Sequence, residues 1–231
     1  FHGTSRSHPT SATQGWLADD RGLAATGPQS VDRSKFVLAR TGVENYQAAR
    51  QFLTRHMAGQ ESRQQPFFLY YACHSNHTKH TPCTELAGVP VAGQGRPAGR
   101  RSDFIYENDV VLGELMKFLQ TKQDPRRPGH MLMENTLFIF TSDNGAENTS
   151  KMATGPVRSN KGSVYEGGHR IPMIVAWQEG GVGNADPSTA GRTSRFPVGL
   201  VDLFATFAEL VDAAGGKTGG EDSYNILPVL R

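Results

Sequence analysis

The sequence predicts an α/β fold in which helices cover both faces of a mainly parallel sheet. Three short apolar runs, at 66–72, 136–141 and 171–177, have the length and composition of buried strands. Amphipathic segments with helical spacing alternate with these runs. With 231 residues, of which 37% are hydrophobic and 20% charged, the chain can form the core that such a fold needs.

The first half of the chain is predicted to hold a helix, a strand and a long loop. Residues 1–40 are polar and are expected to be mostly loop. Apolar residues at helical spacing then predict a helix over 43–58. These residues are Val43, Tyr46, Ala49, Leu53 and Met57. The strand at 66–72 follows, and 73–102 shows no periodicity, so it is a long loop of the kind that is usually functional.

The second half of the chain again alternates predicted helices and strands. A helix over 103–121 is predicted from one apolar face, and Ser102 or Asp103 is expected to cap its start. The face comprises Ile105, Leu112, Leu115 and Leu119. After the two later strands, apolar spacing predicts a last helix over 200–211, which the glycine pair at 215–216 should end.

Charge and composition exclude several classes of partner. The net charge is +2, whereas nucleic-acid-binding proteins usually have a stronger basic bias, so no nucleic-acid partner is expected. No apolar run approaches the length of a membrane span. The two cysteines, Cys73 and Cys83, do not form a disulfide framework, and whether they pair is left open.

Two residues with metal-binding oxygen atoms and one positively charged side chain lie between the second and third predicted strands. Asp143 and Asn144 directly follow a strand, and their carboxylate and amide oxygens suit Ca²⁺ or Mg²⁺. The alternative is that Asp-Asn-Gly is only a strand-ending turn. Lys161 can hold an anionic group or stabilise charge on a leaving oxygen, or it is a solvated surface lysine. Asp143 and Asn144, like His77, lie just past predicted strand ends, where α/β sheets bind ligands.

The residues that follow Lys161 have a structural interpretation. Gly167 and Gly168 form a pair that allows positive φ at a tight turn before the third strand. Arg170 is expected to pair with Glu166 or with another carboxylate. We therefore assign no chemistry to this part of the loop.

The loop after the first predicted strand is rich in histidine and cysteine. Three histidines and two cysteines fall within residues 73–83 and could ligate zinc. Zinc ligands usually come as separated pairs, however, and here they crowd one short loop. The other interpretation is that a single histidine contacts an anionic substrate and donates a proton.

Five segments, in this order, resemble the later part of the catalytic domain of formylglycine-dependent sulfatases, which belong to the alkaline-phosphatase-like superfamily. They are PFFLYYACHSNHTKHTP, YENDVVLGELMKFL, NTLFIFTSDNG, KGSVYEGGHRIPMIVAW and VDLFATFAEL. T-S-D-N-G combined with K-G-x-x-Y-E-G-G-x-R-x-P is a specific signature. The resemblance covers about 43–230. It implies that 1–231 is a single, partial catalytic domain that lacks the half with the nucleophile motif and the C-terminal subdomain.

The resemblance implies roles for four residues. Asp143 and Asn144 match the metal ligands of the family, usually to calcium, with magnesium also possible. Lys161 matches the lysine that contacts the sulfate, and His77 the histidine at the leaving oxygen of the ester. His77 is preferred to His80 because it fits the A-x-x-x-x-H spacing of the family.

The chain departs from the family pattern at the nucleophile. Family members make formylglycine from a Cys or Ser in C-x-P-x-R or S-x-P-x-R, and neither Cys73 nor Cys83 lies in such a motif. Asp19-Asp20 resembles the strand-borne metal pair of the family, but no strand precedes it and no nucleophile motif follows, so we reject this match. Formylglycine is expected in the missing N-terminal part, and this chain alone is expected to be inactive.

The implied function is that of a sulfuric ester hydrolase, arylsulfatase-like, acting on a sulfated carbohydrate or an aryl sulfate ester. Two alternatives stay open. One is a phosphodiester or phosphonate ester hydrolase of the same superfamily, and the other is a non-catalytic, sulfatase-like protein that binds anions. The resemblance also implies a periplasmic or secreted location.

Overall fold

The computed structural model describes residues 37–147, 153–183, 191–213 and 219–231. The chain divides into two compact units, 1–130 and 131–231. The Asp19-Asp20 pair and the glycines at 215–216 lie outside the described residues. Every helix in the described ranges is too short or too polar to cross a lipid bilayer.

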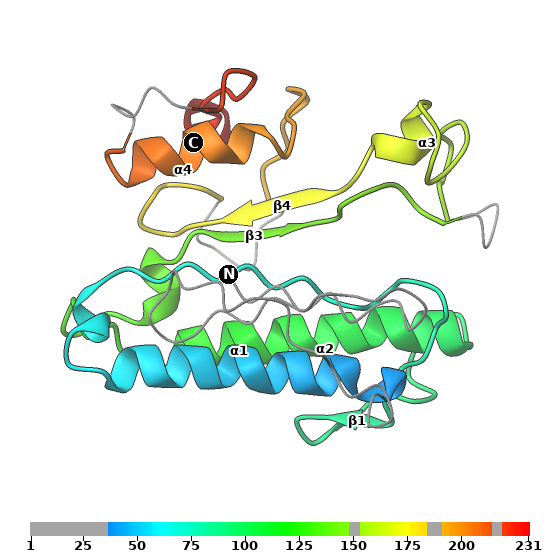
Figure 1. The fold of residues 1–231 in the computed structure, drawn as a ribbon, viewed down its shortest axis with the longest axis horizontal. Coiled ribbons are helices and arrows are strands. Elements are labelled where there is room, and N and C mark those ends of the chain that lie inside the picture. Colours follow the sequence, from blue (N-terminus) through cyan, green and yellow to red (C-terminus); the bar gives the residue numbers. More distant parts are fainter. Residues whose placement is uncertain (1–36, 148–152, 184–190, 214–218) are drawn as a thin grey trace. The chain divides into compact units, whose positions relative to one another are not determined.

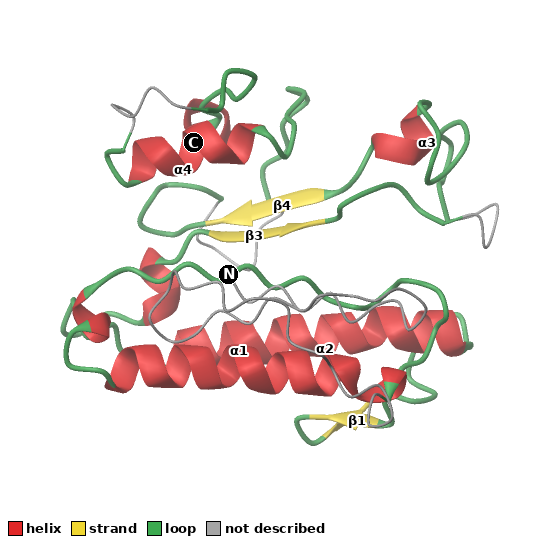
Figure 2. Ribbon diagram, viewed as in Figure 1, coloured by secondary structure: helices red, strands yellow, loops and turns green. Residues whose placement is uncertain are grey.

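Two long helices lie in the first unit (Figures 1 and 2). Helix α1 spans Thr41–Ala58 and helix α2 spans Arg100–Thr121. The two helices pack against each other. The apolar side chains that they bury include Tyr46, Ala49, Leu53, Phe104, Val111, Leu115, Phe118 and Leu119. The helix predicted over 43–58 is therefore confirmed, with a start two residues earlier.

Helix α2 begins three residues before its predicted start, at Arg100, and the expected cap is wrong. Gly99 occupies the cap position, and no side chain caps the helix. The Asp103 carboxylate instead accepts hydrogen bonds from the backbone N–H groups of Gly93 (2.9 Å) and Gly95 (2.8 Å). Because both carboxylate oxygens bind the preceding loop, Asp103 fixes that loop rather than the helix end.

The buried face of α2 is also rotated from the predicted one. Ile105 was expected inside and is 43% exposed, whereas Phe104 and Glu107 are each 1% exposed. Leu115 and Leu119 are buried as predicted. Hydrophobic periodicity counts only apolar positions, so it could not include a buried carboxylate in the stripe.

The sequence predicts a buried strand over 66–72, and this prediction is wrong. The segment is irregular, and Phe68 and Tyr70 are 59% and 58% exposed. A strand forms only where a neighbour completes its hydrogen bonds, and no described strand pairs with this segment. The loop beyond it contains an unpredicted antiparallel pair, β1 (Glu85–Leu86) with β2 (Val89–Pro90).

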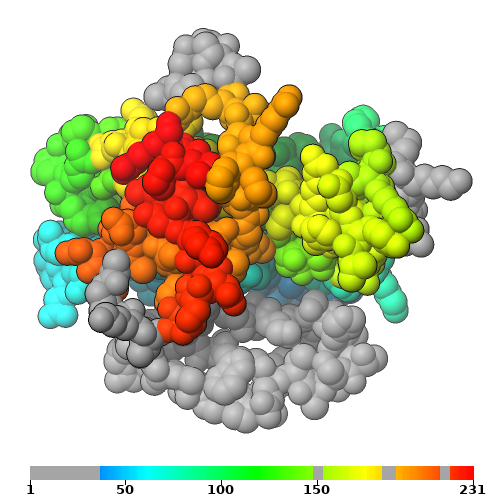
Figure 3. Space-filling model, turned by 90° about the horizontal axis from the view of Figure 1, so that it is seen from above, coloured from blue at the N-terminus to red at the C-terminus, as the bar shows by residue number. Residues whose placement is uncertain are grey.

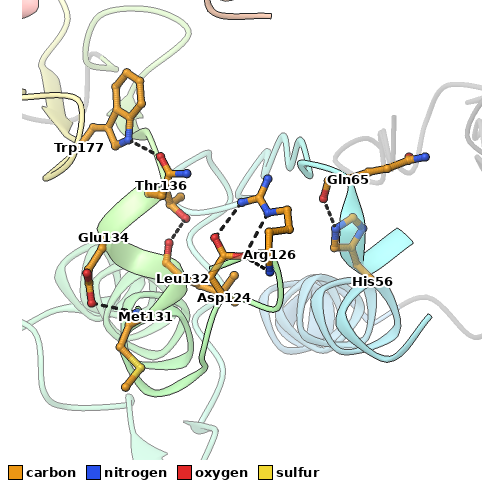
Figure 4. Close-up of polar contacts among 10 residues, drawn as sticks. His56, Gln65, Asp124, Arg126, Met131, Leu132, Glu134, Thr136 and Trp177 are labelled. Atoms are coloured by element: carbon orange, nitrogen blue, oxygen red, sulfur yellow. Dashed lines mark hydrogen bonds and ion pairs between the residues drawn. The ribbon is translucent and has the colours of Figure 1, made fainter. Parts of the chain in front are cut away.

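Short elements flank α1 and follow α2. Turns of 3₁₀ helix span Leu38–Arg40 and Ser62–Gln64. After α2, the guanidinium of Arg126 donates two hydrogen bonds to the carboxylate of the buried Asp124, at 3.1 and 3.0 Å (Figure 4). Burial alone would raise the pKa of Asp124, but the hydrogen bonds and charge of Arg126 hold it below its usual value.

An antiparallel ribbon lies in the second unit (Figure 1). Strand β3 (Phe138–Thr141) pairs with strand β4 (Met173–Ala176), with Phe138 opposite Ala176 and Thr141 opposite Met173. Both strands lie within the predicted runs. The predicted parallel arrangement is wrong for the described strands, because each of their pairs is antiparallel.

The connection between β3 and β4 explains their direction. A parallel pair needs a crossover of a dozen or more residues, usually a helix, that returns to the opposite end of the sheet. Here the described connection holds only the four-residue helix α3 (Glu166–His169). It returns to the strand end that it left, since the Gly145 N–H donates to the Gly168 carbonyl oxygen at 2.9 Å.

A 3₁₀ turn at Leu132–Asn135 anchors the start of β3. At the start of this turn, the Met131 N–H donates to Glu134 Oε1 at 2.9 Å. The Trp177 indole N–H, just after β4, donates to Asn135 Oδ1 at 3.2 Å (Figure 4). Both strands are therefore held at the end opposite to Gly145.

Helix α4 (Asp202–Leu210) confirms the helix predicted over 200–211. The Asp202 carboxylate accepts a hydrogen bond from the Tyr224 N–H at 3.0 Å. The chain ends in the short helix α5 (Leu227–Leu230). Helix α4 and the terminal residues pack together, and they appear in orange and red in Figures 1 and 3.

Candidate active site

Strand β3 leads into a turn that carries Asp143 and Asn144. The Ser142 hydroxyl donates to the Asn144 carbonyl oxygen at 2.9 Å, and Asn144 Nδ2 donates to the Gly145 carbonyl oxygen at 3.1 Å. These bonds fix the turn and engage the amide nitrogen of Asn144, so its amide oxygen is the group left for a ligand. Asp143 is exposed, and its carboxylate has no hydrogen bond or ion pair with any described residue.

Backbone hydrogen bonds bring Lys161 beside this turn. The Lys161 N–H donates to the Ala146 carbonyl oxygen at 2.8 Å, two residues after Asn144. The Lys161 side chain is half-buried and, among the described residues, has no hydrogen-bonding or ionic partner. The structure thus places Lys161 in the same loop cluster as Asp143 and Asn144.

Close packing, rather than positive φ, explains three glycines of this cluster, Gly145, Gly167 and Gly168. A Cβ atom at Gly145 would lie 1.9 Å from the Gly167 carbonyl oxygen. A Cβ atom at Gly167 would lie 2.0 Å from Ser159 O, and one at Gly168 would lie 1.9 Å from Ser163 O. Positive φ is found at neither Gly167 nor Gly168, so the prediction of a positive-φ turn there is wrong.

The arginines near Lys161 have partners within their own loop. Arg170 Nη1 lies 3.0 Å from Glu166 Oε2, which confirms the expected pair. Both side chains are mostly exposed, so the pair contributes less than about 1 kcal/mol. The Arg158 guanidinium lies 3.5 Å from the centroid of the Tyr165 ring. Of the lysines and arginines in the described range 153–170, only Lys161 is therefore without a partner.

The donor chemistry of Asp143 and Asn144 fits a hard divalent cation. Calcium takes six to eight oxygen ligands, including carboxylate and amide oxygens, and magnesium takes six. Two side-chain oxygens would supply part of either shell, and other residues or water would supply the rest. The ammonium group of Lys161 would not ligate a cation, but it can bind an anion.

His77 lies in the first unit, in the loop between α1 and α2. Its backbone N–H donates to the His74 carbonyl oxygen at 3.1 Å, and its Nδ1 contacts the Thr78 carbonyl oxygen. The loop is held further along, where Arg100 Nε donates to the His80 carbonyl oxygen at 3.2 Å. His77 is half-buried, and it belongs to a different unit from Lys161.

The structure does not support zinc binding by the 73–83 loop. Within the described residues, no three histidine and cysteine ligand atoms of this loop come close enough to share a metal. Cys73 is exposed, Cys83 is buried, and both are free thiols. Burial, together with the nearby Glu107, raises the pKa of Cys83 to about 12, which opposes the thiolate form that a zinc ligand needs.

Sequence reasoning missed Glu107. Its Oε1 accepts a hydrogen bond from the Ser75 hydroxyl at 3.2 Å, and its Oε2 accepts one from the Cys83 N–H at 2.7 Å. Burial raises the pKa of Glu107, although these hydrogen bonds oppose the shift. The available signal was its spacing, because Glu107 follows Phe104 by three residues and precedes Val111 by four, on the face of α2 that is buried.

A comparison with known protein families classifies the chain. The family model described as Sulfatase matches residues 12–213, which is most of the sequence. This chain belongs to the sulfatase family. The resemblance found in the sequence motifs is thus confirmed.

Several curated sulfatases are similar to this sulfatase chain. Human N-acetylgalactosamine-6-sulfatase is 32% identical over 174 residues, which are 74% of this chain and 29% of the relative. Human arylsulfatase A is 36% identical over 162 residues, 68% of this chain and 27% of the relative. N-acetylgalactosamine-6-O-sulfatase of Bacteroides thetaiotaomicron is 28% identical over 194 residues, which are 79% of this chain and 32% of the relative.

A solved structure is similar as well. The crystal structure of Ps i-CgsB in complex with k-i-k-neocarrahexaose matches with a TM-score of 0.57 and 25% sequence identity. The match covers 81% of this sulfatase chain and 38% of the other. Together with the family, it confirms the predicted alkaline-phosphatase-like α/β fold. The chain spans less than a third of the length of these curated relatives.

Proposed function

We propose that the protein containing this chain is a sulfuric ester hydrolase, with Lys161 as the sulfate-binding residue and Asp143 and Asn144 as metal ligands. Membership of the sulfatase family supports the reaction class. The observation that carries the residue roles is the cluster after β3, where a backbone hydrogen bond links Lys161 to Ala146, two residues after Asn144. Among the described residues, neither the Lys161 ammonium group nor the Asp143 carboxylate has a hydrogen-bonding or ionic partner. Such a cluster can hold a cation and an anion side by side.

Sulfate ester hydrolysis breaks the bond between sulfur and the bridging oxygen. The ammonium group of Lys161 would donate a hydrogen bond to a non-bridging sulfate oxygen, where it balances negative charge. The imidazolium of His77 would give its proton to the departing oxygen, which leaves as an alcohol, and His77 would become neutral. A divalent cation on Asp143 and Asn144, calcium or alternatively magnesium, would supply further positive charge beside the sulfate.

The nucleophile is expected to be the formylglycine of the family, supplied from outside the residues described here. Neither Cys73, which is exposed, nor Cys83, which is buried, lies in the motif from which family members make it. We therefore assign to this chain the binding of the sulfate and the protonation of the leaving group, but not the attack on sulfur.

A sulfated carbohydrate is the substrate class that we propose. Two of the similar proteins are named as N-acetylgalactosamine sulfatases, and the solved neighbour is in complex with k-i-k-neocarrahexaose. Another relative is named arylsulfatase A, so aryl sulfates are suitable test substrates.

Turnover of matched esters tests the proposal. The complete protein should hydrolyse 4-nitrophenyl sulfate faster than 4-nitrophenyl phosphate, with release of inorganic sulfate. The variant Lys161→Ala should lower kcat by about 10²- to 10³-fold, the loss typical of one donor to a developing negative charge. Lys117→Ala is the matched control, because Lys117 is 70% exposed on α2 and should not affect kcat.

The possible contrary results point to the alternatives. Faster turnover of the phosphate would identify a phosphoester hydrolase of the same superfamily. Binding of a sulfated oligosaccharide without turnover of any ester would identify a non-catalytic anion-binding protein. Equal rates for wild type and Lys161→Ala would remove Lys161 from the site.

A further inference from the structure

The Glu107 carboxylate holds both ends of the segment that carries His77. Ser75 lies two residues before His77 and donates to one carboxylate oxygen at 3.2 Å. Cys83 lies six residues after His77, and its backbone N–H donates to the other oxygen at 2.7 Å. The 75–83 loop is therefore closed through a single side chain of α2.

Two more residues of α2 hold the same loop. Phe104, one turn before Glu107, packs edge-on against the rings of His74 (5.3 Å between centroids) and His80 (6.4 Å). Arg100, one turn earlier still, donates from Nε to the His80 carbonyl oxygen at 3.2 Å. Three successive turns of a rigid helix thus fix the loop at its beginning, middle and end.

The carboxylate is also confined from the side of α1. A Cβ atom at Gly42 would lie 1.9 Å from Glu107 Oε1, so any larger residue at this position would force the carboxylate to move from its place. A carboxylate that is 1% exposed is costly to bury, and apolar residues of similar volume often stabilise a core at least as well. Packing alone therefore does not explain a glutamate here, whereas a need to fix the loop does.

We infer that Glu107 is a positioning residue that holds the 75–83 loop in the conformation from which His77 protonates the leaving oxygen. The inference rests on the proposed sulfatase function. Glu107 itself does not touch the substrate in this scheme. It acts through the hydrogen bonds to Ser75 and Cys83, and its loss should resemble a partial loss of His77.

The dependence of the rate on the leaving group tests this role. An aryl sulfate with a poor leaving group needs the proton from His77, whereas one with a good leaving group does not. In the complete protein, Glu107→Leu should lower kcat for esters with poor leaving groups by about 10²-fold, which is the cost of misplacing a catalytic group such as His77 by about 1 Å. For esters with good leaving groups, kcat should change little. Glu107→Gln should restore most of the rate, because its amide oxygen can accept from the Cys83 N–H while its NH2 group donates to the Ser75 hydroxyl oxygen.

Matched variants separate positioning from a general loss of structure. Gln120→Leu introduces the same side chain at an exposed position of α2 and should leave the leaving-group dependence unchanged. Ser75→Ala removes only one hydrogen bond to Glu107, so this variant tests the proposal even if Glu107→Leu does not fold. Ser75→Ala should lower kcat for aryl sulfates with poor leaving groups by roughly threefold to tenfold. In the His77→Ala background, Glu107→Leu should cause no further loss.

The outcomes distinguish the two proposals. If His77→Ala steepens the leaving-group dependence while Glu107→Leu and Ser75→Ala lower all rates equally or not at all, the positioning role is overturned and the proposed function stands. If His77→Ala does not steepen the dependence, or if the wild-type protein hydrolyses no sulfate ester, the proposed role of His77 fails and the role of Glu107 fails with it.

Discussion

The backbone N–H of Gly145 donates a hydrogen bond to the carbonyl oxygen of Gly168 at 2.9 Å, and this bond closes the connection between β3 and β4. It joins the turn that carries Asp143 and Asn144 to the glycine pair that precedes β4. The contact is so close that a side chain at Gly145 would collide with the Gly167 carbonyl oxygen. The candidate site is thus built on backbone packing between two loop segments.

Gly145→Ala should destabilise the protein and weaken cation binding. The added methyl group would meet backbone atoms, which cannot rotate away, so the expected cost is at least about 1–3 kcal/mol. Gly113→Ala is the matched control, because no atom lies near the added Cβ and alanine is the better helix former by roughly 0.5–1 kcal/mol. Thermal unfolding of both variants checks this, and an unchanged melting temperature for Gly145→Ala would contradict the close packing.

Removal of the Asp143 carboxylate should weaken calcium binding without unfolding the protein. Asp143 is exposed and its carboxylate has no partner among the described residues, so its loss breaks no contact with any of them. Asp143→Ala should raise the calcium Kd by about 10- to 100-fold or more, since even outer partners of metal ligands have effects of this size. Titration calorimetry measures it, with the exposed Asp222→Ala as control. Equal affinities would place the cation elsewhere.

Asp103 should make stability depend on acid pH. Hydrogen bonds from Gly93 and Gly95 lower the pKa of Asp103 below its usual value of 3.8. The folded state therefore favours the carboxylate, so its contribution is present above about pH 4 and is lost as the pH falls through the lower folded pKa. Asp103→Asn should lose this contribution. Urea unfolding from pH 7 to pH 3 should show the gap between wild type and variant narrowing as the pH falls, whereas a constant gap would argue against the mechanism.

Cys73 and Cys83 should differ in their reactivity. Cys73 is exposed, whereas burial and the nearby Glu107 raise the pKa of the buried Cys83 to about 12. At pH 8 the thiolate fraction of Cys83 is then on the order of 10⁻⁴, and the thiolate is the reactive form. Iodoacetamide should label Cys73 in the native protein and both residues in urea. Peptide mapping identifies the labelled cysteines. Labelling of both cysteines at similar rates in the native protein would disprove the burial of Cys83.

Motif order and local periodicity made much of this protein predictable. The helices at 43–58 and 200–211 and the strands ending near Thr141 and Ala176 follow from the spacing of apolar residues, because that spacing depends only on near neighbours in the chain. The same local information placed Asp143 and Asn144 just after a strand. The combination of motifs was specific enough to indicate the family that the comparison confirmed.

By itself, then, the sequence determined the main helices, two strands, the candidate ligands and the family. Only the tertiary structure decided that β3 and β4 run antiparallel, that 66–72 forms no strand, and that Glu107 is buried against the His77 loop. Each of these features depends on a partner far away in the chain: a neighbouring strand, a returning loop or a donor for a buried carboxylate. Periodicity records which residues prefer burial, but it does not record which distant segment will meet them.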